Sequence, residues 1–308
     1  MGRRNKKGDK VDGWVNLDKP LGMTSTQAVG KIRRIMNGQK VGHAGTLDPL
    51  ASGVLPIALG EATKTIPYIQ DSLKTYEFTV TWGEQRNTDD AEGFVIEQSD
   101  HRPARADIEA AMPAFTGEIE QIPPQFSAIK IDGQRAYNMA RRGEDVDIKP
   151  RAVYIESLEL LSTDEDTATI LMTCGKGTYV RSLARDLAIK LGTFGYVSAL
   201  RRMQVGVFSA DNAISLAMIE ELEHIAARNK ALQAVQVVLD DIPALEIKQH
   251  EITALRNGQA LSLISRSDFQ RIENLDHDGE AIAVFEDQAI AIVDIEGPNV
   301  KPVRVFNL

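Results

Sequence analysis

The stretch Gly42–Lys64 reads GHAGTLDPLASGVLPIALGEATK, and it joins a polar loop to an apolar segment. Val54–Leu59 is a short continuous apolar run, which is typical of a buried strand. Ahead of it, Gly42 and Gly45 permit backbone angles that other residues resist, and Asp48-Pro49 favours a turn. We therefore expect this loop to hold the Asp48 carboxylate over a cleft. On composition alone, such an aspartate more often caps a helix or closes an Asx-turn.

Length and composition indicate a globular protein with one large core and a smaller domain. Of the 308 residues, 43% are apolar and 26% are charged, and no apolar run approaches membrane-spanning length. Cys174 is the only cysteine, which excludes an intramolecular disulfide and a cysteine-based zinc site, and the five histidines are scattered. Val11-Asp12-Gly13 stands where a signal peptide would need an apolar stretch, so we expect a cytoplasmic protein.

The charge of the chain is unevenly distributed. Its net charge of −9 disfavours a nucleic-acid partner when taken as a whole. Residues 1–50, however, hold ten Lys and Arg against four Asp and Glu, and residues 171–206 hold six against one, giving local charges of +6 and +5. Residues 207–308 hold eight against seventeen, a local charge of −9. Because a local basic surface is enough to bind phosphates, RNA remains a candidate partner.

Periodicity and turn residues divide the chain into a flexible basic tail at 1–12, an α+β domain at 13–242 and a small β-rich domain at 243–308. In the α+β domain, Thr24 or Ser25 is expected to cap a first helix, and further helices are expected at 106–115 and 181–190. Strands are expected at 14–17, 54–59, 75–82, 153–161, 167–173 and 197–208. Two prolines at 123–124 break this pattern, and the segment from about 122 to 152 is interpreted as an inserted arm.

Several further motifs accompany the Gly42–Lys64 stretch. They are NLDKPLGMTS at 16–25, KTY at 74–76, GTYVRS at 177–182 and LRR at 200–202, followed by Gly206 and Phe208. In this order, from Trp14 to about Phe208, they resemble the motifs of the bacterial tRNA pseudouridine synthases of the TruB family.

The resemblance implies both a fold and an activity. The fold is α+β, with a mixed, mostly antiparallel central sheet flanked by helices (the pseudouridine synthase fold), an arm that closes over RNA and a PUA-like C-terminal domain. The activity is isomerisation of uridine to pseudouridine at position 55 in the T-loop of tRNA. This reaction gains and loses no atom, so no cofactor is expected. The implied partner is the T-arm stem-loop of tRNA, and we expect a monomer with no membrane association and no obligatory protein partner.

The resemblance also assigns roles to individual residues. Asp48 is the catalytic carboxylate, Arg181 pairs with it and favours its ionised form, and Tyr76 stacks on the flipped uracil. The implied substrate-binding residues are His43, which replaces the extruded nucleotide in the stack, Tyr179 and Leu200 in the pocket walls, Lys19 and Pro20, which brace the pocket, and Lys64, which meets backbone phosphate. The implied phosphate contacts of the arm are Lys130, Arg135, Arg141 and Arg142.

Two other functions stay open at the level of sequence. The protein could act chiefly as an RNA-folding clamp, with its arm and C-terminal domain opening and re-forming the tRNA elbow. It could also hydrolyse a glycosidic bond, but such enzymes commonly use a second carboxylate as general acid, and Asp18 and Glu61 lack a clear context for that role. Residue types alone do not decide whether Asp48 attacks C1′, adds to C6 of the uracil or abstracts a sugar proton.

Overall fold

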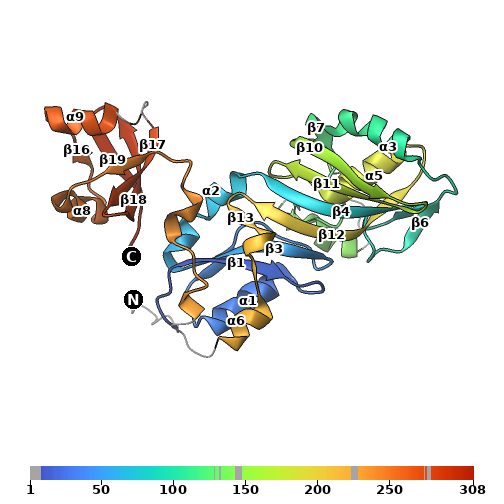
Figure 1. Cartoon of the computed structure of the whole chain (residues 1–308), viewed down its shortest axis with the longest axis horizontal. Helices are drawn as coiled ribbons and strands as arrows, with labels where there is room; N and C mark the ends of the chain where they lie inside the picture. Colours follow the sequence, from blue (N-terminus) through green and yellow to red (C-terminus); the bar gives the residue numbers. More distant parts are fainter. Residues whose placement is uncertain are drawn as a thin grey trace.

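The structure is a computed structural model that describes residues 8–127, 129–131, 133–142, 148–222, 228–273, 275 and 279–308. Figure 1 shows a large domain built on one long, twisted sheet and a smaller domain beside it, which residues from about 244 onward form. No described helix combines the length and the apolar character that crossing a membrane requires.

The large sheet contains ten strands and is mixed but mostly antiparallel, as expected. Its order is β14 (Ile214–Ser215), β1 (Gly13–Lys19), β3 (Ala51–Leu59), β12 (Gly195–Val205), β4 (Lys74–Trp82), β11 (Thr167–Cys174), β10 (Arg151–Thr163) and β7 (Gly117–Gln121). In addition, β2 (Val41–His43) pairs with β3, and β13 (Phe208–Ser209) pairs with β12. The β1–β14 and β3–β12 pairs are parallel.

Strand β3 is covered on both faces, which explains its unbroken apolar run. Leu55, Ile57 and Leu59 pack with α1 (Ser25–Ile35) and α6 (Leu216–Glu221). Val54 and Ala58 point to the opposite face and pack in a cluster that includes side chains of the C-terminal domain. The strand that leads out of the Asp48 loop is therefore fixed from two sides.

The other half of the sheet has a separate core. Strands β4, β10, β11 and β12 pack against α5 (Val180–Lys190), α3 (Arg105–Ala111) and the 3-10 helix η2 (Met112–Phe115). Sequence periodicity predicted one helix over 106–115, and this prediction was wrong at its C-terminal end. Pro113 removes a backbone donor and ends the α-helix, so the last four residues form a 3-10 turn.

Smaller elements lie between the main strands and helices along the chain. They are the 3-10 helix η1 (Gly60–Lys64), α2 (Ile66–Asp71), the hairpin of β5 (Glu84–Arg86) and β6 (Val95–Gln98), and two 3-10 helices, η3 (Ala210–Asn212) and η4 (Val235–Val238). The arm leaves the sheet after β7 and returns at β10, whose residue Arg151 pairs with Gln121. Its described part contains β8 (Lys130–Ile131), β9 (Gln134–Arg135) and α4 (Ala136–Arg141).

The C-terminal domain is a five-stranded sheet with two helices. Its strand order is β15 (Ala244–Glu246), β17 (Gly279–Phe285), β18 (Gln288–Glu296), β19 (Asn299–Val305) and β16 (Leu261–Ser262). The helices are α8 (Gln249–Arg256) and α9 (Arg266–Glu273). Phe306 and Ile292 from this domain are fully buried in the same cluster as Trp14 of β1, so the two domains share a core.

Candidate active site

The loop between β2 and β3 carries Asp48 and is held by contacts from both of its sides. Gly45 has a φ of +91°, which favours glycine, whereas Gly42 lies in β2 with no positive φ, contrary to the expectation that both glycines serve the turn. The Ser25 hydroxyl accepts the Leu47 N–H and donates to the Leu47 carbonyl, both at 2.9 Å. The start of α1 therefore fixes the residue directly before Asp48.

Arg202 holds the same loop from the inside of the sheet. Its side chain is fully buried, and its Nε donates to the Val54 carbonyl at 2.7 Å. Its Nη2 donates to the Gly45 carbonyl at 3.2 Å. Burial raises the pKa of the Tyr76 hydroxyl, and the positive charge of Arg202 opposes this larger effect. One guanidinium therefore ties β3 to the Asp48 loop, since its planar fork can serve several acceptors at once.

Arg181 forms the electrostatic centre of the site. Its Nη2 lies 2.9 Å from Asp48 Oδ2, and its Nη1 lies 3.4 Å from Asp90 Oδ2. Nη1 also donates to the Thr88 carbonyl at 3.0 Å, and Nη2 donates to the Phe126 carbonyl at 3.1 Å. The Arg181 side chain is only 8% exposed and that of Asp90 only 10%, whereas Asp48 is 43% exposed. Asp48 is therefore the carboxylate of this group that a substrate can reach.

A cleft of about 440 Å³ opens in front of Asp48. Its lining includes Tyr76 from β4, Leu200 from β12 and Tyr179 at the N-terminus of α5. Burial raises the pKa of both tyrosine hydroxyls, so both rings are neutral at pH 7. The lining also contains Asp71, Lys74 and Lys176. Aromatic and aliphatic side chains beside the Asp48 carboxylate suit a planar base whose sugar lies next to the acid. Among the described residues, no group of His, Cys, Asp or Glu side chains is arranged to hold a metal ion.

Comparison with known proteins identifies the family. Residues 33–180 match the model described as TruB family pseudouridylate synthase (N terminal domain), and residues 181–243 match the tRNA pseudouridylate synthase B C-terminal domain. The chain belongs to the TruB family. The cleft and the Asp48–Arg181 pair lie within the segments that these two models match.

Full-length TruB relatives are close in sequence. A Caulobacter vibrioides protein named tRNA pseudouridine synthase B is 49% identical over 307 residues, covering 99% of both chains. A Rhodospirillum rubrum protein of the same name is 46% identical over 306 residues, again covering 99% of both. Among solved structures, a chain in a Cbf5-Nop10-Gar1 complex is 25% identical, with a TM-score of 0.70, covering 95% of this chain and 84% of that one. A chain in an H/ACA RNP bound to a substrate RNA is 22% identical and shares the fold with a TM-score of 0.72. The match covers 100% of this chain and 92% of that one.

Two further expected site residues, Lys19 and Pro20, lie outside the lining of the cleft, and their bracing role stays a prediction. Lys19 is fully buried and donates to the carbonyls of Pro20 and Met23 at 2.9 and 2.7 Å. The Gly22 N–H in the same turn donates to the Pro49 carbonyl at 2.8 Å. Burial lowers the pKa of the Lys19 amine to about 8. Lys19 and Pro20 thus lie in a turn that is bonded directly to the Asp48 loop.

His43 and Lys64 lie outside the lining of the cleft. Burial lowers the pKa of the His43 imidazole, so the ring is neutral at pH 7 and suited to stacking. Lys64 lies 2.6 Å from Glu61 and donates to the Val305 carbonyl at 2.6 Å. The structure thus gives Lys64 a contact with the C-terminal domain, and its phosphate contact stays a prediction.

The arm residues are described in part. The structure describes the backbone of Lys130, Arg135 and Arg141 but not their side chains, so their expected phosphate contacts lie outside the described atoms. Arg142 is exposed, and its Nη2 donates to Gln134 Oε1 at 2.9 Å.

Sequence reasoning missed several residues of the site. Gln121 accepts the Tyr179 N–H at 2.8 Å and donates to the Tyr179 carbonyl at 3.1 Å, so it sets the start of α5. Asp90 shares Arg181 with Asp48, and Arg202 supports the loop. Arg202 stood in a quoted motif, but neither Gln121 nor Asp90 belongs to a local pattern that predicts a contact with α5.

Proposed function

We propose that this TruB-family protein isomerises uridine to pseudouridine at position 55 in the T-loop of tRNA, with Asp48 as the catalytic carboxylate. The observation that carries the proposal is the half-exposed Asp48, paired at 2.9 Å with buried Arg181 at the edge of a cleft lined by Tyr76 and Tyr179. The names and near-half identity of the full-length relatives support tRNA uridine as the substrate class.

The geometry suits the steps of this reaction. The bond from N1 of the base to C1′ of the ribose must break, the detached uracil must turn over, and C5 must bond to C1′. A cleft with aromatic and aliphatic walls can hold the loose base away from water while it turns. Asp48 at the cleft edge is placed to act at the sugar or at C6 of the base, and the three routes for its carboxylate remain alternatives within the proposal.

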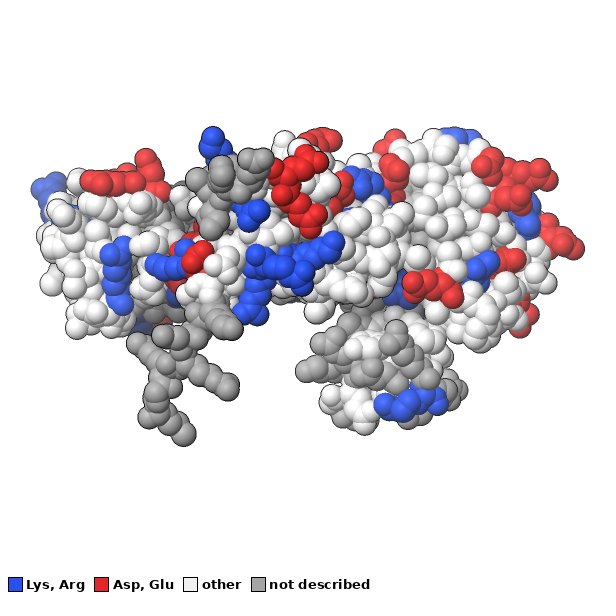
Figure 2. Space-filling view, turned by 90° about the horizontal axis from the view of Figure 1, so that it is seen from below, with Lys and Arg blue, Asp and Glu red and all other residues white. Residues whose placement is uncertain are grey.

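The surface next to the site can bind an RNA backbone. We call Lys31, Arg33, Arg34 and Lys40 the basic face; all four are exposed, and none forms a salt bridge to another described residue. Figure 2 shows Lys and Arg side chains gathered in the middle of one side of the molecule, over α1. No Asp or Glu occurs between Asp18 and Asp48, so this local positive charge is not cancelled. Phosphates attracted here would lie beside the helix that supports the Asp48 loop.

Glycosidic hydrolysis has less support than isomerisation. Asp18 is paired with Arg201 at 3.0 Å, and Glu61 is paired with Lys64, so neither is available as a general acid beside Asp48. Asp90 contacts the same arginine, Arg181, as Asp48, but its side chain is nearly buried. Its Oδ1 already accepts the Thr88 hydroxyl at 2.5 Å and the Glu92 N–H at 3.1 Å. With these donors and Arg181 already bound to it, the Asp90 carboxylate is not free to meet a substrate.

The decisive experiment maps pseudouridine in unmodified tRNA after incubation with the wild type or with Asp48→Asn. We expect the wild type to modify position 55 alone and the variant to bind tRNA with unchanged affinity and form no product. Product formation by the variant at the wild-type rate would remove Asp48 from catalysis. Free uracil without a carbon-linked product would indicate hydrolysis, and accelerated tRNA folding without any product in the wild type would favour the clamp.

A further inference from the structure

Arg185 joins three parts of the protein that are distant in sequence. It lies on α5, one helical turn after Arg181, and its side chain is 15% exposed. Its Nη1 lies 3.0 Å from Asp89 Oδ2, and its Nη2 donates to the Ile122 carbonyl at 2.9 Å. Its Nε donates to Asp186 at 2.9 Å. Arg185 therefore connects the turn around Asp89 to the first residue of the arm.

The turn at Thr88–Asp90 supplies two of the ligands of Arg181. Asp89 is buried and has a φ of 60°, a conformation that costs a residue with a Cβ about 1 kcal/mol or more. The backbone of this residue accepts the Val197 N–H at 3.1 Å, and its carboxylate meets Arg185. The flanking Thr88 carbonyl and Asp90 carboxylate both contact Arg181. The Asp89–Arg185 pair thus stabilises a strained turn that positions Arg181.

The base of the arm is bound to the same helix. The Ile122 carbonyl accepts the Ser182 hydroxyl at 2.7 Å as well as Arg185, and the Phe126 carbonyl accepts Arg181. Beside the pair lies a cleft of about 360 Å³, whose lining includes Ile96, Ile122 and Arg185. Because this space separates the β5–β6 hairpin from the arm base, the polar contacts through Arg185 link the two segments there.

We propose that Asp89 and Arg185 form a positioning pair that couples the base of the arm to Arg181 and, through Arg181, to the Asp48 carboxylate. This inference rests on the proposed catalytic role of Asp48. Neither member of the pair touches the cleft in front of Asp48; they act by fixing the turn and the arm carbonyls that surround the Arg181 guanidinium. When the arm is placed correctly, Arg181 has its full set of partners, and Asp48 is held in the reactive position.

The test measures the single-turnover rate of pseudouridine formation and the tRNA affinity of Asp89→Asn, Arg185→Met and the double variant. We expect each single variant to lower the rate roughly 10- to 100-fold, because a displacement of about 1 Å in a catalytic group can have that effect. The tRNA affinity should stay within about twofold. Because the two residues act as one unit, the double variant should be no slower than the slower single variant.

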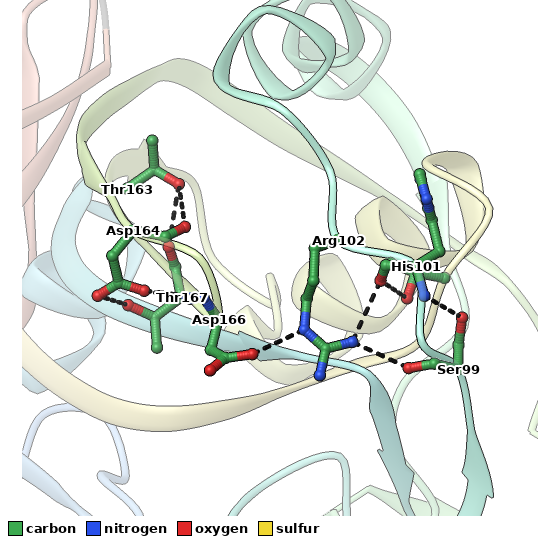
Figure 3. Close-up of polar contacts among 8 residues, drawn as sticks. Ser99, His101, Arg102, Thr163, Asp164, Asp166 and Thr167 are labelled. Carbon is green, nitrogen blue, oxygen red and sulfur yellow. Dashed lines mark hydrogen bonds and ion pairs between the residues drawn. The ribbon is translucent and has the colours of Figure 1, made fainter.

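Arg102 provides a matched control on the same domain. As Figure 3 shows, it also joins a carboxylate to backbone carbonyls: its Nε lies 2.7 Å from Asp166, and its Nη1 donates to the Ser99 carbonyl at 2.9 Å. Asp166 directly precedes β11, and its backbone carbonyl accepts the Trp82 N–H. Trp82 lies six residues along β4 from Tyr76, so this contact is about 20 Å from the cleft. Arg102→Met should leave the single-turnover rate unchanged.

The pH dependence of the single-turnover rate tests whether the charge of Asp89 positions Arg185. Burial raises the pKa of the Asp89 carboxyl to about 6, in spite of Arg185 and Arg181. Asp186 on α5 raises this pKa further, and Arg86 on β5 lines the same cleft as Asp89; Asp90 is its neighbour along the chain. Below pH 6 the protonated carboxyl no longer balances Arg185, so the wild-type rate should fall. The ratio of wild-type to Asp89→Asn rates should therefore shrink as the pH falls from 7 to 5.5.

The outcomes distinguish this inference from the proposed function. If the wild type modifies tRNA and Asp48→Asn does not, but folded Asp89→Asn and Arg185→Met variants react at the wild-type rate, the positioning pair is disproved and the function stands. Loss of tRNA affinity in step with rate would also overturn it, because the pair would then serve binding alone. If a single variant fails to fold, the double variant replaces it, since removing both charges leaves none unpaired in the interior.

Discussion

At the scale of single residues, three arginines make different contacts in the site. Arg181 partners the carboxylates, Arg202 holds the loop from within the sheet, and Arg185 joins the arm base to the Asp89 turn. Each is nearly buried, and each donates to at least one backbone carbonyl. Lysine in any of these places could not make the same set of contacts, because an ammonium lacks the planar fork of a guanidinium.

Arg202→Met should destabilise the fold strongly. The change leaves the carbonyls of Val54 and Gly45 without their donor in a buried site, so we expect a loss of about 3 kcal/mol or more in the free energy of unfolding. Urea unfolding followed by circular dichroism measures it. The neighbouring Arg201→Met is the control: its pair with Asp18 is about one-third exposed, and its loss should cost less than about 1 kcal/mol. Equal losses in both variants would contradict this role of Arg202.

Sequence motifs predicted a common site for Asp48, Tyr76, Tyr179 and Arg181, and the structure places all four around one cleft. The supporting residues Asp89, Asp90 and Gln121 were not predicted. Their partners lie about 60 to 100 positions away along the chain, so no local spacing reveals them. Their contacts exist only because the arm base and the β5–β6 hairpin are folded against α5.

At the scale of elements, the start of α1 both caps the helix and holds the Asp48 loop. The Thr24 hydroxyl accepts the Gln27 N–H at 3.1 Å, and Gln27 Oε1 accepts the Thr24 N–H at 2.9 Å, which completes a capping box. The next residue, Ser25, binds the backbone of Leu47 instead. Two adjacent hydroxyls thus serve two different segments.

Ser25→Ala and Thr24→Ala should have different effects because of this division. Ser25→Ala removes both bonds to Leu47 and should slow pseudouridine formation, together with a loss of about 1–3 kcal/mol in unfolding free energy. Thr24→Ala removes only the cap and should cost about 1 kcal/mol with an unchanged rate. Single-turnover assays and urea unfolding of both variants make the comparison. If Thr24→Ala slowed the reaction as much as Ser25→Ala, support of the loop by Ser25 could not be the cause.

The long elements were predicted well because each has a clear period or an unbroken apolar run. The expected strands at 54–59 and 75–82 correspond to β3 and β4, and the expected helix at 181–190 corresponds to α5. The short pairs β5–β6 and β8–β9 were less accessible to sequence reasoning, since each strand has only two to four residues and so shows no clear period.

At the scale of the whole molecule, the two domains should unfold together. Phe306 is completely buried in the cluster that contains Trp14 and Val54, so Phe306→Ala removes a contact from both sides of the domain junction. We expect a loss of about 3–5 kcal/mol and coincident urea transitions by tryptophan fluorescence and circular dichroism. Val303→Ala, at a side chain that is 53% exposed on β19, should change the stability by less than about 0.5 kcal/mol. Two separate transitions in the wild type would rule out a shared core.

The uneven charge leads to a prediction about RNA affinity. Each neutralised phosphate contributes a slope of roughly 0.7 to 0.9 to the fall of log affinity with log salt concentration. Replacing Lys31 and Arg34 of the basic face by glutamine should therefore reduce the slope for tRNA by about 1.4 to 1.8. The control variant replaces Lys190 and Arg105, which are exposed on α5 and α3, and should keep the wild-type slope. Filter binding at several salt concentrations gives both slopes, and equal slopes in the two variants would exclude the basic face from RNA binding.

Coverage of β3 on both faces has a consequence for hydrogen–deuterium exchange. Amides of a strand enclosed by α1, α6 and the C-terminal domain can reach deuterated solvent only when the protein opens globally, whereas those of the exposed strand β6 exchange through local fraying. We therefore expect Asp48 to lie just before one of the slowest-exchanging segments among the described residues. Deuterium uptake at Val54–Leu59 would consequently report the global opening free energy of the protein. Uptake in the Asp48 loop would report the free energy of local opening against the contacts of Arg202 and Ser25.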